Sequence, residues 1–226
     1  MTAVDRVPDE LYDAYILDMD GTVYLGDELL PGAKELILEL RARGIPVRFR
    51  SNNPTKDPRA YADRLDRLGI PTPVEEIASY DRSFTYEKLQ IAFDAIWFHR
   101  CARSMTTNPD RYCPFPGGRG EPDAASIVAA IEASTGTRCE RNFGKPDAAM
   151  LEAALSELGV SVSRAIMVGD RLSTDIRMAV DAGMVSALVL TGDPTMKDVL
   201  DVRPEIRPTF VLDRVDRLIP GLLPEA

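Results

Sequence analysis

Apolar residues recur along this chain with the spacing of helices and strands in turn. Residues 33–43 place Leu36, Ile37 and Leu40 on one face, which predicts an amphipathic helix that ends at Gly44. The other predicted elements follow the same alternation of strand and helix: strands at 14–17, 45–50, 165–168, 185–190 and 209–212, and helices at about 58–68, 146–158 and 174–182. This order predicts an α/β fold with a Rossmann-like, doubly wound parallel sheet.

The middle of the chain breaks this order. Its predicted elements are a helix at 84–98, a short strand near 104–106, a stretch rich in Pro and Gly at 113–122, and a helix at 123–133. A segment of this kind between two halves of an α/β unit is typical of an inserted cap. We therefore expect a core made of residues 1–77 and 142–226, with a small α/β cap at 78–141. Within it, Gly117–Gly120 does not have the spacing of a phosphate-binding P-loop, so we expect a plain loop there.

Composition narrows the class of protein. The chain has 226 residues, 45% of them hydrophobic, which is enough for a substantial buried core. A net charge of −9 argues against nucleic acid as the main partner. The polar N-terminus and the lack of a long apolar segment favour a cytoplasmic protein with no membrane partner.

The cysteines and the histidine are few. Cys101, Cys113 and Cys139 are odd in number and widely spaced, so we expect free thiols. His99 is the single histidine, which excludes sites built from paired histidines within one chain. We expect it to have a structural role.

Two carboxylates follow the first predicted strand. Asp18 and Asp20 are separated by one residue, and acids this close repel each other unless a cation or a proton lies between them. Gly21 and Thr22 suit a sharp turn after the second acid. A magnesium ion is the favoured explanation, although the same residues also occur in ordinary turns.

Three further motifs end or follow predicted parallel strands. Ser51-Asn52 offers a hydroxyl and an amide, Lys145 precedes a helix, and Asp170 is followed by Asp175. In a doubly wound sheet these groups can converge on one crevice with the first two acids. A carboxylate nucleophile, phosphate-binding donors, a lysine and metal-binding acids are what phosphoryl transfer requires. Each motif alone has a structural explanation, as a turn, a surface residue or a helix-terminal acid.

These motifs resemble those of the haloacid dehalogenase (HAD) superfamily, in its NagD or p-nitrophenylphosphatase-like branch. The similarity is carried by DMDGT at 18–22, SNN at 51–53, TNPD at 107–110, GKP at 144–146 and GDRLSTD at 169–175. It implies a Mg²⁺-dependent phosphomonoester hydrolase that acts on small phosphorylated metabolites.

The resemblance also implies a role for each matching residue. Asp18 would be the nucleophile that becomes an aspartyl phosphate, and Asp20 the general acid and base. Mg²⁺ would be held by Asp18, Asp170 and the backbone carbonyl of Asp20. Asp175 would orient metal-bound water or Lys145 without binding the metal itself. The phosphate would be held by three other residues: Ser51, Asn52 and Lys145.

Two features depart from this pattern. Arg48 and Arg50 share one face of the strand before Ser51, where a central parallel strand should be apolar. Either that face is open or paired with acids, which we favour, or Arg50 adds charge to the site. The segment at 77–83 is also abrupt, so the cap is expected to be shortened and its specificity broad.

Other functions remain compatible with these residues. A phosphotransferase or mutase would use the same aspartyl phosphate, and a phosphate-responsive binding module would use the same acids without turnover. The sequence leaves open the physiological substrate and the oligomeric state, including a homodimer through the cap.

Overall fold

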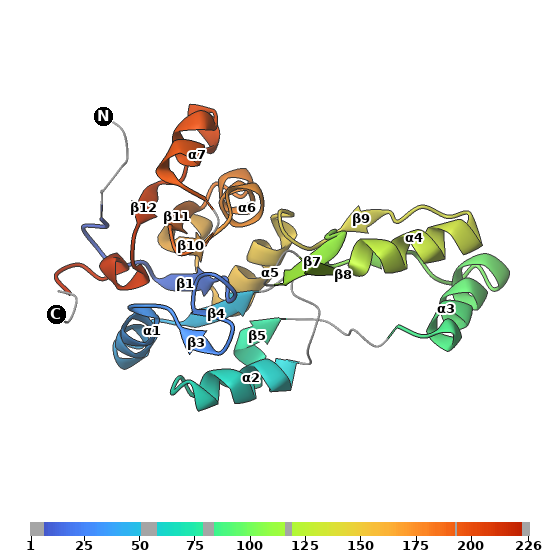
Figure 1. Ribbon diagram of the computed structural model, residues 1–226, viewed down its shortest axis with the longest axis horizontal. Helices are drawn as coiled ribbons and strands as arrows, with labels where there is room; N and C mark the ends of the chain where they lie inside the picture. Colours follow the sequence, from blue (N-terminus) through green and yellow to red (C-terminus); the bar gives the residue numbers. More distant parts are fainter. Residues whose placement is uncertain (1–6, 51–57, 79–83, 116–118, 193, 223–226) are drawn as a thin grey trace.

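The computed structural model describes residues 7–50, 58–78, 84–115, 119–192 and 194–222 (Figure 1). A six-stranded sheet forms its centre, in the order β12-β11-β10-β1-β4-β5, and every neighbouring pair in it is parallel. Its strands are β1 (Ala14–Leu17), β4 (Val47–Arg50), β5 (Ile77–Ala78), β10 (Ala165–Gly169), β11 (Val185–Val189) and β12 (Phe210–Leu212). The parallel α/β fold expected from the sequence is confirmed.

Helices cover both faces of this sheet (Figure 1). They are α1 (Ala33–Ala42), α2 (Pro58–Arg67), α5 (Ala149–Leu158), α6 (Arg177–Asp181) and α7 (Met196–Asp201). Alternate residues of β1 separate the two layers, because successive side chains of a strand point to opposite faces. Tyr15 and Leu17 belong to the core cluster beneath α1 and α2, whereas Ala14 and Ile16 pack in the cluster beneath α5 and α6.

The order of the strands places the chain's polar loops together. From β1 the chain runs outward through β4 to β5, and it later returns to the other side of β1 as β10. The strand order therefore reverses beside β1, and ligands of open α/β sheets bind outside the carboxyl ends of the strands at such a point. Asp18 follows β1 there and Asp170 follows β10.

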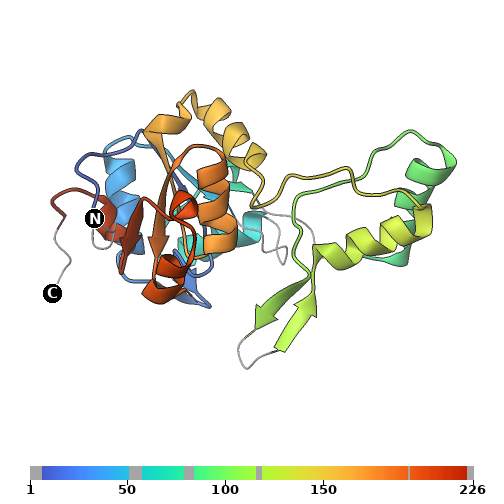
Figure 2. The same cartoon turned by 90° about the horizontal axis from the view of Figure 1, so that it is seen from above.

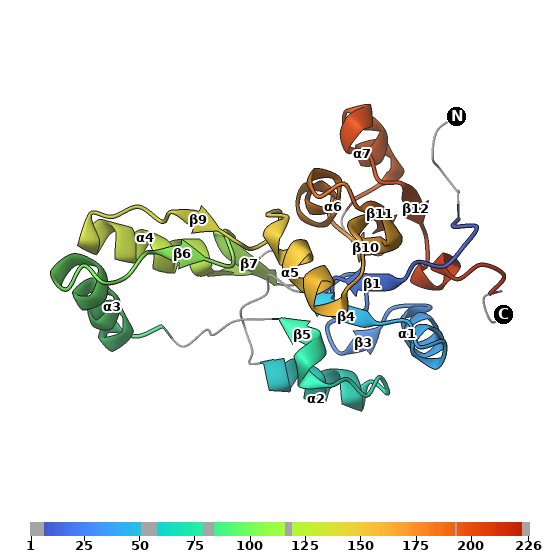
Figure 3. The same ribbon diagram turned by 180° about the vertical axis from the view of Figure 1, so that it is seen from behind.

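A second lobe lies apart from the sheet (Figure 2). It contains α3 (Tyr86–Phe93), which continues as a π-helical turn at Asp94–Phe98, and α4 (Ala124–Thr135). Two short strand pairs complete it, the parallel pair β6 (Met105–Thr106) and β9 (Arg141–Asn142) and the antiparallel pair β7 (Tyr112–Phe115) and β8 (Arg119–Pro122) (Figure 3). All of these elements except β9 fall inside the predicted cap, whose boundaries at 78 and 141 stay a prediction.

One local expectation was wrong, and one local element was not foreseen. Arg119 and Gly120 of the expected plain loop lie in β8, because antiparallel backbone pairing with β7 tolerates Pro and Gly in this exposed hairpin; Gly117 and Gly118 lie outside the described residues. A small hairpin after the acidic loop, β2 (Tyr24–Leu25) and β3 (Glu28–Leu29), was not expected at all.

The described part of the chain contains two free cysteines and no membrane-spanning helix. Cys101 and Cys139 are free thiols. None of the described helices is long and apolar enough to cross a bilayer.

Arg50 is buried beneath α5. Its side chain is 7% exposed, and its Nη1 donates a hydrogen bond to the carbonyl oxygen of Phe49 at 3.0 Å. Burial lowers the pKa of Arg50, and the opposing charge that raises this pKa is Glu157 of α5. This face is therefore not open at Arg50, and its pairing with acids stays a prediction from the sequence.

Among the described residues, the buried guanidinium of Arg50 donates one hydrogen bond, which recovers less free energy than its desolvation costs. We predict that Arg50→Met raises the melting temperature by about 2–4 °C, which corresponds to about 1 kcal/mol for a chain of this size. Thermal unfolding followed by circular dichroism would measure this change, and a lowered melting temperature would contradict the account of Arg50.

Candidate active site

Three buried carboxylates meet at the carboxyl ends of β1 and β10. Asp18, Asp170 and Asp175 each offer one carboxylate oxygen, and these oxygens all lie within 4.8 Å of one another. Asp175 comes from the helical turn Leu172–Ile176 that follows β10. The three residues are at most 7% exposed. We call these three residues the acid cluster.

Lys145 provides the positive charge next to this cluster. Its Nζ lies 2.7 Å from Oδ1 of Asp175 and is also ion-paired with Oδ1 of Asp18. The lysine is 2% exposed and comes from the segment that leads into α5. One ammonium therefore faces three carboxylates, and the fully ionised group carries excess negative charge.

The protonation equilibria of these groups reflect that excess. Burial raises the pKa of Asp18 well above its ordinary value, with the charges of Asp175 and Asp170 acting in the same direction and Lys145 against it. Burial and the charge of Asp175 raise the pKa of Asp170 to about 7. Burial alone would lower the pKa of Lys145, but the neighbouring carboxylates of Asp175 and Asp18 outweigh it and raise this pKa.

The acid cluster fits a divalent cation such as Mg²⁺. Hard oxygen ligands and a net negative charge are what this ion requires. Oδ1 of Asp170 is buried and has no hydrogen-bond partner among the described residues, so it can accept a metal bond. A metal there would replace the missing positive charge.

Two glycines, Gly21 and Gly192, leave the space that the Asp170 carboxylate occupies. A Cβ atom at Gly21 or at Gly192 would collide with Oδ2 of Asp170, so only glycine leaves room for the carboxylate in this position. The hydroxyl of Thr191 donates a hydrogen bond of 2.5 Å to the carbonyl oxygen of Gly21. Thr191 and Gly192 were missed from the sequence, although they directly follow the predicted strand at 185–190.

The other predicted site residues, Asp20, Ser51 and Asn52, are not among the residues of the acid cluster. The carboxylate of Asp20 is not part of the acid cluster; its backbone bridges to that of Tyr24. Burial, followed by the charge of Asp20, raises the pKa of the buried Tyr24 hydroxyl. Ser51 and Asn52 lie outside the described residues.

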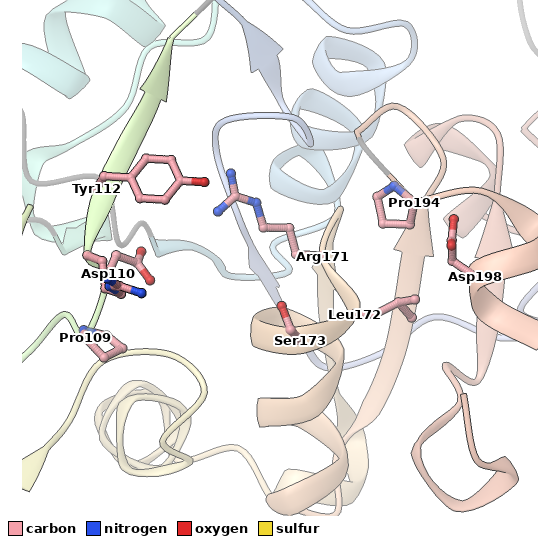
Figure 4. Close-up of a pocket in the computed structure, with 9 residues that line it drawn as sticks. Pro109, Asp110, Tyr112, Arg171, Leu172, Ser173, Pro194 and Asp198 are labelled. Carbon is pink, nitrogen blue, oxygen red and sulfur yellow. The ribbon is translucent and has the colours of Figure 1, made fainter. Parts of the chain in front are cut away.

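A cavity of about 730 Å³ opens between the second lobe and the core, and one of its lining residues, Arg171, directly follows Asp170 of the acid cluster (Figure 4). Asp110 and Tyr112 line it from the lobe, and Arg171 and Ser173 line it from the loop that also carries Asp170. The hydroxyl of Tyr112 and the guanidinium of Arg171 point toward each other across this cavity (Figure 4). Arg171 was not singled out from the sequence, although it adjoins a predicted metal ligand.

Comparisons with known proteins agree with this geometry. Residues 15–86 match the family model of haloacid dehalogenase-like hydrolases, and residues 142–218 match a HAD-hydrolase-like model. The crystal structure of a 4-nitrophenylphosphatase from Thermotoga maritima is 30% identical, covers 92% of this chain and 96% of its own, and has a TM-score of 0.78. The chain therefore belongs to the haloacid dehalogenase-like hydrolases, in their NagD and p-nitrophenylphosphatase-like branch.

Two further relatives add detail. A 5′-nucleotidase of Bacillus subtilis is 29% identical over 257 residues, covering 92% of this chain and 98% of that protein. Since 92% of 226 residues is about 208, roughly 50 aligned positions have no residue of this chain. A glycerol phosphate phosphatase from Mycobacterium tuberculosis, solved in complex with magnesium, is 25% identical, covers 92% of this chain and 77% of its own, and has a TM-score of 0.77.

Because the pKa of Asp170 is raised in the native state, we predict that the free energy of unfolding of the metal-free protein falls as the pH rises. The native state holds this proton up to a pH of about 7, whereas the unfolded chain releases it near 3.8, so the native state is stabilised at low pH. That contribution is lost as the pH rises through this window. Asp170→Asn cannot ionise and should become more stable than the wild type, by several degrees in melting temperature, between pH 4 and 7.

Thermal unfolding of both proteins in a metal chelator, at half-unit pH intervals, would measure this difference. The difference should level off above the pKa of about 7. A difference in melting temperature that does not change with pH would contradict the assigned protonation of Asp170.

Proposed function

We propose that this protein is a Mg²⁺-dependent phosphomonoester hydrolase that works through an aspartyl phosphate on Asp18. At the coarser level it is a HAD-type phosphatase, in accord with its family and with the phosphatases among its relatives. The observation that carries the finer proposal is the buried Asp18 carboxylate, held by Lys145 and grouped with Asp170 and Asp175 at the reversal point of the sheet.

In the first half-reaction a carboxylate oxygen of Asp18 attacks phosphorus, and the bond between phosphorus and the ester oxygen breaks. Asp20 donates a proton to that departing oxygen, which leaves as an alcohol. In the second half-reaction Asp20 takes a proton from water, whose oxygen attacks the phosphorus of the aspartyl phosphate. Inorganic phosphate leaves and the Asp18 carboxylate is restored.

Charge neutralisation is the main task of the other residues. Lys145 balances the negative charge of the phosphoryl oxygens, and Ser51 and Asn52 are proposed to donate hydrogen bonds to them. Mg²⁺ would be held by Asp18, Asp170 and the backbone carbonyl of Asp20, and when bound it would polarise the phosphoryl group. Asp175 would keep Lys145 in place through their 2.7 Å ion pair.

Small phosphorylated metabolites are the proposed substrates. The relatives are a nucleotidase, a nitrophenylphosphatase and a glycerol phosphate phosphatase, all of which act on small phosphate esters. The net charge of −9 opposes binding of nucleic acid. The cytoplasmic location and a homodimer through the cap stay predictions from the sequence.

Asp18→Asn should abolish turnover, because an amide is a poor nucleophile although it occupies the same volume. Magnesium-dependent release of phosphate from p-nitrophenyl phosphate would measure this loss, with circular dichroism to confirm the fold. Asp213→Asn, at an exposed ion pair with Arg217, is a matched control that should keep full activity. Substantial activity of pure Asp18→Asn would exclude the covalent mechanism.

Asp20→Asn should slow the release of a poor leaving group far more than that of an activated one. General acid catalysis contributes about 10²- to 10⁴-fold in rate, and nitrophenolate departs without it. The measurement compares kcat on an alkyl phosphate and on p-nitrophenyl phosphate for wild type and variant. Equal losses on the two substrates would remove Asp20 from the acid role.

A further inference from the structure

The cavity between the second lobe and the core is lined on its core side by Arg171. Arg171 follows Asp170 in the chain and has extended backbone angles, φ −121° and ψ 125°. Because successive side chains of extended backbone point to opposite sides, Asp170 enters the acid cluster while Arg171 faces the cavity. A phosphate ester with its phosphorus at Asp18 would therefore extend its leaving group past Arg171.

The Arg171 guanidinium is available for a ligand. No hydrogen bond or ion pair of its side chain is found among the described residues, although a guanidinium can donate five hydrogen bonds. Partial burial lowers the pKa of Arg171, but the charges of Asp170, Asp18, Asp175 and Asp110 outweigh it, so the group stays cationic. Within the described parts of the chain, its donors are therefore free to bind a ligand in the cavity.

The opposite wall is held in place by buried hydrogen bonds. Asn108 is 1% exposed, its Oδ1 accepts a bond of 2.7 Å from the backbone N–H of Asp110, and its Nδ2 donates to Oδ1 of Asp123 at 3.3 Å. The N–H of Asp123, which caps α4, donates to the carbonyl oxygen of Arg111 at 3.1 Å. The backbone that carries Asp110 and Tyr112 is thereby tied to the start of α4.

The chemistry of the two walls selects among leaving groups. The walls offer hydrogen-bond donors from the guanidiniums of Arg111 and Arg171 and from the hydroxyls of Tyr112 and Ser173. The carboxylates of Asp110 and Asp198 are the acceptors. The formal charges of the two arginines and the two aspartates on these walls cancel, so a second anionic group gains no net attraction there. A nucleobase would find one aromatic ring among the cavity's lining residues. A neutral group with several hydroxyls both donates and accepts, so it matches these walls best.

We propose that this cavity binds the leaving group of the substrate and that Arg171 selects leaving groups with hydroxyls near the ester bond. The inference rests on the proposed phosphatase function and deepens it. Hydrogen bonds from a charged group to a hydroxyl distinguish a polyol phosphate from an alkyl phosphate of the same length. Arg171 is thus assigned as a specificity-determining residue.

The test uses a matched pair of substrates, glycerol 3-phosphate and n-propyl phosphate, which differ in their hydroxyls. Wild-type protein should favour glycerol 3-phosphate in kcat/KM. Arg171→Gln should lower kcat/KM for glycerol 3-phosphate by about 10- to 100-fold and for n-propyl phosphate by less than about 3-fold. Tyr112→Phe, which keeps the ring, should show a smaller loss on glycerol 3-phosphate alone.

Arg177→Gln is the matched control, because Arg177 is ion-paired with Asp181 on α6 and does not line the cavity. It should leave both substrates unchanged. Equal losses on the two substrates in Arg171→Gln would overturn the proposal, since Arg171 would then act on the phosphate or the metal. Equal kcat/KM of the two substrates in wild type would overturn it as well.

A binding measurement separates this inference from the proposed function. In the Asp18→Asn background, calorimetry with glycerol 3-phosphate and Mg²⁺ reports binding without turnover. Adding Arg171→Gln should weaken this binding about tenfold or more, whether or not the wild type hydrolyses the ester. Unchanged affinity would overturn the leaving-group site, whereas weakened affinity with an inactive wild type would overturn hydrolysis alone.

Discussion

The buried ammonium of Lys145 between Asp18 and Asp175 is the interaction on which the rest of the site depends. Burying charges is costly unless each finds a partner, and here three carboxylates share one lysine. The parallel sheet supports this arrangement because it brings the ends of β1 and β10 side by side. The charge that remains unbalanced makes the acid cluster fit Mg²⁺ and gives the site its proposed chemistry.

The residues around the acid cluster have two proposed roles: some position the reacting groups, and others bind the leaving group. Gly21 and Gly192 leave room for the Asp170 carboxylate, because a Cβ atom at either position would collide with it. On the other side of Asp170, Arg171 faces a cavity whose far wall comes from the second lobe. Roughly 50 positions of a full-length relative have no counterpart in this chain.

The sequence predicted what depends on local pattern. Apolar periodicity gave the sheet strands β1, β4, β10, β11 and β12, and acids at strand ends marked Asp18, Asp170 and Asp175. It missed Thr191 and Gly192, whose importance comes from a close approach to Asp170 that only the folded chain creates. The exposed hairpin of β7 and β8 was also missed, because its Pro and Gly residues mimic a loop.

Calorimetric titration of Mg²⁺ into the metal-free protein between pH 5 and 8 tests the central claim most directly. Binding of a metal to an acid cluster must displace the proton that Asp170 holds up to a pH of about 7. We expect one Mg²⁺ per chain, tighter binding as the pH rises, and a smaller proton release in Asp170→Asn, where only the raised pKa of Asp18 is left to supply a displaced proton. Binding that is absent, or that shows neither pH dependence nor proton release, would contradict this claim.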